Sequence, residues 1–337
     1  MQQNLLAERK KKYFLENSNY ISQSTLKKYQ FPYLPKNPNF QPSDLYHEEK
    51  DYSLEGTLAD EILCGGNIDE YYVLNKNPSK EVKSICHFVH DNLVIGNNHE
   101  VIRLIISSPD FDKFDNRIKD KKKKLKMIIE QGKEYFECLQ RKEIPISEDS
   151  WKTATNVAES MKRAFGDKWF QYDTYNQVAI YLEIPRNGHI IKVKALLDKV
   201  VIKNNKVYII DIKTTGKSTL DFPRAVVDYG YDIQGVWYTM LFQMMMHTDI
   251  IQPDEQTEEL RQRVLNENLD YDTEFTFLVE STKNQGFPLE YCMDNDKLTE
   301  TFENKLQPLI NNYIWSLENP DSIYNKEYTA NGFKINL

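Results

Sequence analysis

The spacing of hydrophobic residues changes once along the chain, near residue 165. Before it, apolar side chains recur every three or four positions, which predicts helices over residues 56–64, 79–93, 98–108, 113–140 and 147–165. After it, apolar and polar residues alternate over residues 169–184, 192–202, 206–213, 274–282 and 287–294, which predicts strands. Helical spacing returns over residues 223–246 and 298–319. This order predicts an α/β (α+β) protein with a mixed central sheet flanked by helices.

The first 55 residues mix Asn, Pro, Gln and charged side chains and form a separate region. Ser22 or Ser24 is expected to cap a short helix that begins at Thr25. Four prolines then interrupt any regular element: Pro32, Pro35, Pro38 and Pro42. We therefore expect residues 1–55 to form a helix and an extended arm. Residues 56–165 form a mostly helical elaboration, and residues 166–337 form the core.

The composition excludes several classes of protein. The chain of 337 residues has a net charge of −8, 40% hydrophobic and 28% charged residues, which is typical of a soluble globular protein. No apolar run is long enough to cross a bilayer, and the N-terminus lacks the apolar centre of a signal peptide, so we expect a cytoplasmic protein. The acidic total argues against broad coating of DNA but is compatible with a local basic groove. The cysteines, Cys64, Cys86, Cys138 and Cys292, are far apart, which favours reduced thiols over a zinc site or an iron–sulfur cluster.

Two aspartates are expected to meet across a hairpin in residues 193–213. Asn204 and Asn205 form a credible two-residue turn because Asn tolerates positive φ. If they form the turn, facing residues have numbers that sum to 409, and Asp198 faces Asp211 on one side of the sheet. Lys213 lies two residues beyond Asp211 and therefore shares this face.

Two carboxylates at this separation repel each other unless they share a proton, meet water or hold a cation. Hard oxygen ligands suit Mg²⁺ or Mn²⁺, and the backbone carbonyl of Ile212 would complete the set with Asp198 and Asp211. Lys213 would then orient water or stabilise the transition state of phosphodiester hydrolysis. A simpler interpretation remains open at this point, in which the polar residues mark the place where the strand reaches water.

The helical stretch after the hairpin adds two polar side chains. Gln234 and Tyr238 are four residues apart and share one face of a helix that begins again after Gly230. Both can bind phosphate oxygens or a terminal base. They are equally compatible with an ordinary amphipathic helix.

Together, the segments ALLDKV, IIDIKTT and AVVDYGYDIQGVWY resemble the PD-(D/E)XK nuclease superfamily, with the closest likeness to RecB-type and RecE-like (exodeoxyribonuclease VIII-like) phage exonucleases. The family pattern is matched by Asp198, Asp211, Lys213, Gln234 and Tyr238. The resemblance implies a restriction-endonuclease-like sheet and Mg²⁺-dependent cleavage of DNA. It also implies a homo-oligomer that threads duplex ends in phage recombination or replication, inside the host cytoplasm, and it suggests a single-strand annealing protein as partner.

The N-terminal half resembles the family less closely. In EGTLADEIL, Asp60 stands where the family has a metal-binding His, so Asp60 is either a metal ligand or a solvated helix residue. Some relatives carry a further acid before the paired strands, and Gln177 occupies that place here, with Glu183 as a substitute. Besides Gln234 and Tyr238, the residues expected to contact DNA are the basic ones that flank the proposed site: Lys192, Lys194, Lys217 and Arg224.

Three functions follow from these observations. The first is a metal-dependent exodeoxyribonuclease. The second, motivated by Asp60 and Gln177, is a module of the same fold that binds DNA ends or another protein with weak or no cleavage. The third is a structure-specific endonuclease.

Overall fold

The computed structural model describes residues 12–13, 19–29, 51–94, 96–186, 188–248, 254–272 and 274–318. The arm expected around the four prolines lies outside these ranges. The chain divides into two compact units. One contains residues 59–66 and 156–337 with the N-terminal segment, and the other contains residues 51–58 and 67–155. No helix in the described ranges is both long and apolar enough to cross a membrane.

The smaller unit is mostly helical. Its main helices are α4 (Lys80–Asn92), α5 (Asn98–Ser107) and α6 (Lys121–Arg141), and their apolar faces form one core. Two short strands, β1 (Tyr71–Leu74) and β2 (Ile144–Ser147), pair in parallel beside them. A 3₁₀ turn, η4 (Ile68–Glu70), precedes β1.

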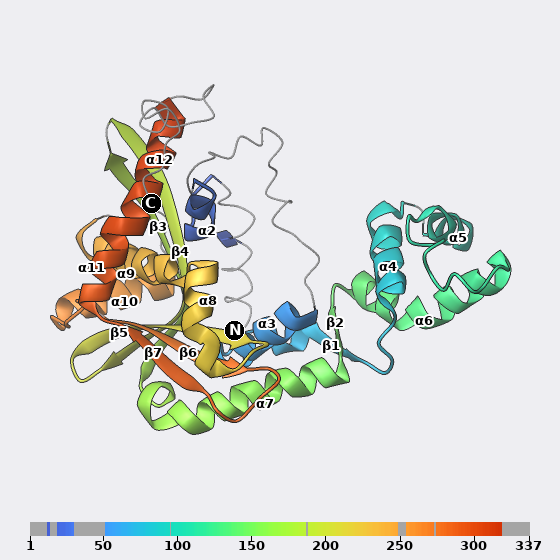
Figure 1. The fold of residues 1–337 in the computed structure, drawn as a ribbon, viewed down its shortest axis with the longest axis horizontal. Coiled ribbons are helices and arrows are strands. Elements are labelled where there is room, and N and C mark those ends of the chain that lie inside the picture. Colours follow the sequence, from blue (N-terminus) through green and yellow to red (C-terminus); the bar gives the residue numbers. More distant parts are fainter. Residues whose placement is uncertain are drawn as a thin grey trace. The chain divides into compact units, whose positions relative to one another are not determined.

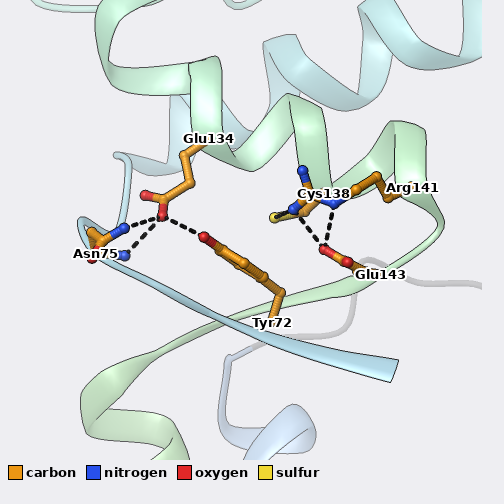
Figure 2. A network of polar contacts seen from close by, with 6 residues as sticks. All are labelled: Tyr72, Asn75, Glu134, Cys138, Arg141 and Glu143. Atoms are coloured by element: carbon orange, nitrogen blue, oxygen red, sulfur yellow. Dashed lines mark hydrogen bonds and ion pairs between the residues drawn. The ribbon is translucent and has the colours of Figure 1, made fainter. Parts of the chain in front are cut away.

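Polar contacts fasten β1 to α6 in this unit. Figure 2 shows Glu134 of α6 accepting hydrogen bonds from the Tyr72 hydroxyl at 3.2 Å and the Asn75 amide at 2.5 Å. Further along the helix, Arg141 binds Glu143 at 2.7 Å and lies over the Tyr72 ring. The contacts of Glu134 join residues about sixty positions apart and hold β1 against the helix.

The larger unit is built on a five-stranded sheet in the order β3-β4-β5-β6-β7 (Figure 1). The strands are β3 (Asp173–Arg186), β4 (His189–Lys203), β5 (Lys206–Thr215), β6 (Phe275–Ser281) and β7 (Leu289–Met293). β5 and β6 run parallel, and the other neighbours run antiparallel. The sheet is therefore mixed and flanked by helices, as the sequence predicted.

A long connection joins the parallel strands β5 and β6, as parallel pairing requires. It contains η6 (Thr219–Asp221), α8 (Phe222–Tyr229), α9 (Tyr231–His247) and α10 (Glu255–Asn266). Gly230, with φ of 61°, ends α8 and begins α9, as expected from the sequence. α10 was not expected.

Helix α9 packs along one face of the sheet. The Trp237 indole donates to the Lys194 carbonyl at 3.0 Å, and Gly235 lies so close to the sheet that an added Cβ would be 3.0 Å from Met293 and Phe275. β7 is followed by α11 (Asn295–Thr301), the π-helical turn η7 (Phe302–Leu306) and α12 (Gln307–Glu318). On the other face, Ser160 in α7 (Glu148–Phe165) donates to the buried carboxylate of Glu280 on β6. A second π-helical turn, η5 (Gly166–Phe170), follows α7.

The sheet opens between β4 and β5, and we call this point the fork. β4 pairs with β5 only through residues 199–203, whereas it pairs with β3 over nearly its whole length. β5 continues beside β6 as far as Thr215. Beyond the fork, Ile21 forms a parallel bridge with Val193 on the edge of β4 that does not pair with β5. Figure 1 shows the β3–β4 hairpin continuing past its pairing with β5, beside α2 (Gln23–Leu26).

Several local predictions are confirmed. Ser22 caps α2 by accepting the Thr25 N–H, although the helix begins at Gln23 and not at Thr25. Asn204 and Asn205 have φ of 51° and 60°, which makes the predicted two-residue turn. Helix α3 (Asp51–Cys64) begins earlier than expected. α6 begins later, at Lys121, because the side chain of Asp120 caps it there.

Candidate active site

Asp198 lies at the fork, at the first position of β4 beyond its pairing with β5. The paired residues run from Lys203↔Lys206 to Lys199↔Ile210, all with numbers that sum to 409, which is the register predicted from the Asn-Asn turn. If the ladder continued, Ile212 would face Leu197. Instead, the Ile212 N–H donates to Asp198 Oδ2 at 3.0 Å, so this carboxylate takes the place of a strand partner.

Asp211 is almost completely buried, with 1% of its surface exposed. Its Oδ1 accepts from Gln234 Nε2 at 2.7 Å, and its Oδ2 lies 2.5 Å from Lys213 Nζ as an ion pair. Oδ2 makes no directed hydrogen bond with any described residue. The buried carboxylate is therefore held on one side by an amide and on the other by an ammonium.

The charges at the fork perturb one another. Burial raises the pKa of the Asp211 carboxyl to about 7, the Lys213 ammonium opposes this shift, and the charges of Asp198 and Asp60 add to it. Burial acts to lower the pKa of Lys213, but Asp211 and Asp198 outweigh it, and the pKa is raised. Three carboxylates and one ammonium therefore act on one another in this small region.

The backbone of Ile212 also faces the fork. The N–H and C=O of one strand residue point to the same edge, and the Ile212 N–H points towards β4. Its carbonyl therefore points to the side where β4 has departed. The carboxylates of Asp198 and Asp211, together with this carbonyl, fit a hard divalent cation that keeps several waters. Within the described ranges, no three His, Cys, Asp or Glu side chains are grouped to hold a metal ion.

Asp60, on α3, belongs to the same region, but both of its carboxylate oxygens accept hydrogen bonds from other side chains. Its Oδ1 accepts from the Cys64 thiol at 3.2 Å, and its Oδ2 accepts from Gln177 Nε2 at 3.0 Å. Cys64 also lies 3.5 Å from the Asp198 carbonyl. Asp60 therefore belongs to the site through its charge and its neighbours. Glu183, in contrast, pairs with Lys192 at 3.3 Å, away from the fork.

Gln234 and Tyr238 occupy the α9 side of the site, as their spacing predicts, but both are buried. The Gln234 amide is directed at Asp211, so it orients the carboxylate in this structure. Burial raises the pKa of Tyr238 well above its ordinary value, and the charges of Asp211 and Asp198 contribute. Neither side chain lies on the surface of this conformation.

The four basic residues expected to contact DNA have different environments. Lys217 and Arg224 are exposed, and Arg224 lies 3.5 Å from Asp228. Lys192 pairs with Glu183. Lys194 is 7% exposed and donates to the Tyr13 carbonyl at 2.6 Å, so its ammonium is enclosed by protein.

Lys27 is a neighbour of the site that no sequence pattern indicates. Its Nζ donates to the Tyr229 carbonyl at 2.8 Å and lies 5.9 Å from the centre of the Tyr231 ring, while Lys213 lies 5.2 Å from the same ring. Burial, together with the charge of Lys213, lowers the pKa of Lys27 to about 8. Lys27 has no local signal because its contact joins residues 202 positions apart.

Comparisons with known proteins give little further support for a particular activity. No family model matches the chain, and no curated protein matches it. A solved structure titled "Putative exonuclease" from Eubacterium rectale is similar at a TM-score of 0.42 and 14% identity, covering 88% of this chain and 82% of that chain. A second, titled SSO0001, has a TM-score of 0.24 and 13% identity, covering 67% and 83%. These likenesses are too weak to assign an activity.

Proposed function

We propose that this protein is a metal-dependent deoxyribonuclease that hydrolyses phosphodiester bonds of duplex DNA. The observation that carries the proposal is the buried carboxylate of Asp211, bound by Gln234 on one oxygen and by Lys213 on the other, beside Asp198. A buried carboxylate with a raised pKa and a specific charged partner is typical of a functional site.

Asp198, Asp211 and the Ile212 carbonyl would hold Mg²⁺ or Mn²⁺. The bound cation supplies Lewis acidity towards water and towards a phosphoryl oxygen. Lys213 orients the attacking water or stabilises negative charge on the phosphate. Gln234 holds Asp211 in place, and Asp198 fixes the backbone of Ile212.

Cleavage of linear duplex DNA in the presence of Mg²⁺ tests this function. We expect degradation by the wild type and a loss of ~100-fold or more in Asp211→Asn and Lys213→Met, which each remove one charge from the site. Glu303→Gln, a change at an exposed residue of η7, is the matched control and should keep full activity. Full activity in Asp211→Asn or Lys213→Met would exclude this mechanism.

The proposal extends to exonuclease action at duplex ends during phage recombination, with homo-oligomers and a single-strand annealing partner. Closed circular DNA separates exonuclease from endonuclease, because an exonuclease requires an end and should leave the circle intact.

A second candidate is a module that binds DNA without cutting it. It is favoured by Asp60, which binds Gln177 and Cys64 and, among the described residues, does not complete a three-residue metal group. Binding of labelled duplex without cleavage, in both Mg²⁺ and Mn²⁺, would support this alternative.

A further inference from the structure

Gln177 has an unusual backbone conformation in the interior of β3. Its φ is 51°, in the left-handed region, and its side chain is 2% exposed. The other non-glycine residues with positive φ in the described ranges lie in turns or after helices: Asp115, Lys142, Asn204, Asn205 and Asn268. A non-glycine residue in this region is strained and persists where its surroundings impose it, often at functional sites.

The strain lies directly across from Asp198. β3 and β4 pair on both sides of this point, at Asn176↔Lys199 and Val178↔Leu197, but the pair Gln177–Asp198 is absent from the ladder. The alternation of core residues shifts here on both strands, since Tyr175 and Val178 share one core, as do Leu197 and Val200. The distortion of β3 and β4 therefore lies at Gln177 and Asp198, next to the fork.

The conformation directs the Gln177 amide at Asp60. Gln177 Nε2 donates to Asp60 Oδ2 at 3.0 Å, while the Cys64 thiol binds the other oxygen. The same thiol lies 3.5 Å from the Asp198 carbonyl, so Cys64 joins Asp60 to the fork. Asp211 is buried, and its Oδ2 makes no directed hydrogen bond within the described ranges. A third carboxylate is thus held one side chain away from the backbone of Asp198.

We propose that Gln177 is a positioning residue: its strained backbone holds its amide on Asp60 and so keeps a third carboxylate charge beside Asp198 and Asp211, which increases the affinity of the site for a divalent cation. This inference rests on the proposed function, because it assumes that the aspartate pair binds such an ion. A purely structural role would instead make the Gln177–Asp60 hydrogen bond a tie between β3 and α3.

Titration of the metal-free protein with Mn²⁺ by calorimetry, paired with thermal melting in EDTA, separates the two roles. Gln177→Gly relieves the backbone strain but removes the amide, and Gln177→Met removes the amide but keeps the strain. We expect the two variants to differ in melting temperature, with glycine the more stable, yet both to bind Mn²⁺ about tenfold more weakly than the wild type. Asn205→Gly is the matched control, since it relieves a positive φ in the hairpin turn, and its affinity should equal that of the wild type.

A double-mutant cycle with Asp60→Asn tests whether Gln177 acts through Asp60. We expect Gln177→Met combined with Asp60→Asn to bind Mn²⁺ no more weakly than Asp60→Asn alone. The proposal is overturned if Gln177→Gly and Gln177→Met keep wild-type affinity, or if the two losses multiply in the double variant. A wild-type protein that binds no Mn²⁺ would overturn the proposed function as well, so the two failures are distinguishable.

Discussion

The carboxylate of Asp198 accepts the backbone N–H of Ile212 at 3.0 Å, at the point where β4 and β5 separate. One oxygen of Asp198 thus completes the hydrogen bonding of an interrupted ladder. Asp198 therefore has a structural role and, in the proposed function, a second role as a metal ligand. Substitutions at Asp198 can separate these two roles.

Asp198→Asn keeps an acceptor for the Ile212 N–H but removes the charge. We expect a melting temperature within a few degrees of the wild type and loss of Mn²⁺ binding by calorimetry. Asp198→Ala also leaves the Ile212 N–H without its acceptor, which costs about 1–2 kcal/mol more in the free energy of unfolding. Equal Mn²⁺ affinity in Asp198→Asn and the wild type would contradict the assignment.

Asp211 is expected to make the metal-free protein less stable as pH rises from about 4 to 7. Its pKa is about 7 in the folded state, against an ordinary value of 3.8. In this range the unfolded carboxyl is ionised while the folded one retains its proton, so the folded state binds more protons and loses stability with increasing pH. Asp211→Asn should remove this contribution, so that its free energy of unfolding differs less between pH 5 and pH 8 than that of the wild type.

Urea denaturation in EDTA at pH 5 and pH 8 measures this effect. Glu303→Gln, which changes an exposed acid, serves as the control and should follow the wild type. If the difference in stability between the two pH values is the same in Asp211→Asn and the wild type, Asp211 does not titrate as the structure indicates.

The sequence was sufficient for the hairpin and its register. Asn204 and Asn205 adopt positive φ by their own local preference, and a two-residue turn then determines which residues face each other. Helical spacing put Gln234 and Tyr238 on one face of a helix, and the family resemblance put that face near Asp211, where Gln234 is found. Such features depend on short segments, for which local preference and tertiary structure agree.

The other features of the fold and of the site depend on contacts between segments that are distant in the sequence. The separation of β4 from β5 cannot be recognised in a strand pattern, because both strands continue with other partners. Gln177 has no sequence signal for a left-handed conformation, and Lys27 reaches the site from the N-terminal segment. The short strands β1 and β2 are far apart in sequence and carry too few residues for periodicity to distinguish them.

Gly235→Ala tests the close packing of α9 on the sheet. The added methyl would lie 3.0 Å from Met293 and Phe275, closer than ordinary packing allows. We expect a loss of about 1–3 kcal/mol in the free energy of unfolding, measured by urea denaturation. Gly216→Ala is the control because nothing lies within 4 Å of its added Cβ, and it should be nearly neutral. A neutral Gly235→Ala would show that α9 does not pack as closely as described.

The exposure of the basic residues predicts which of them contribute to DNA affinity. Lys217 and Arg224 are exposed, whereas burial lowers the pKa of Lys194 to about 8 and its ammonium binds the Tyr13 carbonyl. Binding of a basic side chain to a phosphate releases counterions, so removing one such side chain reduces the slope of log affinity against log salt by about 0.9. We expect the double variant Lys217→Gln, Arg224→Gln to reduce this slope by about 2, and Lys194→Met to leave it unchanged.

Fluorescence anisotropy of a labelled duplex in EDTA, at several salt concentrations, measures these slopes without cleavage. Lys194→Met also controls for the loss of one positive charge, because it removes a lysine that the fold encloses. A smaller slope in Lys194→Met, with no change in the double variant, would mean that the DNA path follows β4 beyond the fork. The strands would then have to open further than in this structure, because Ile21 bridges to Val193 at that edge.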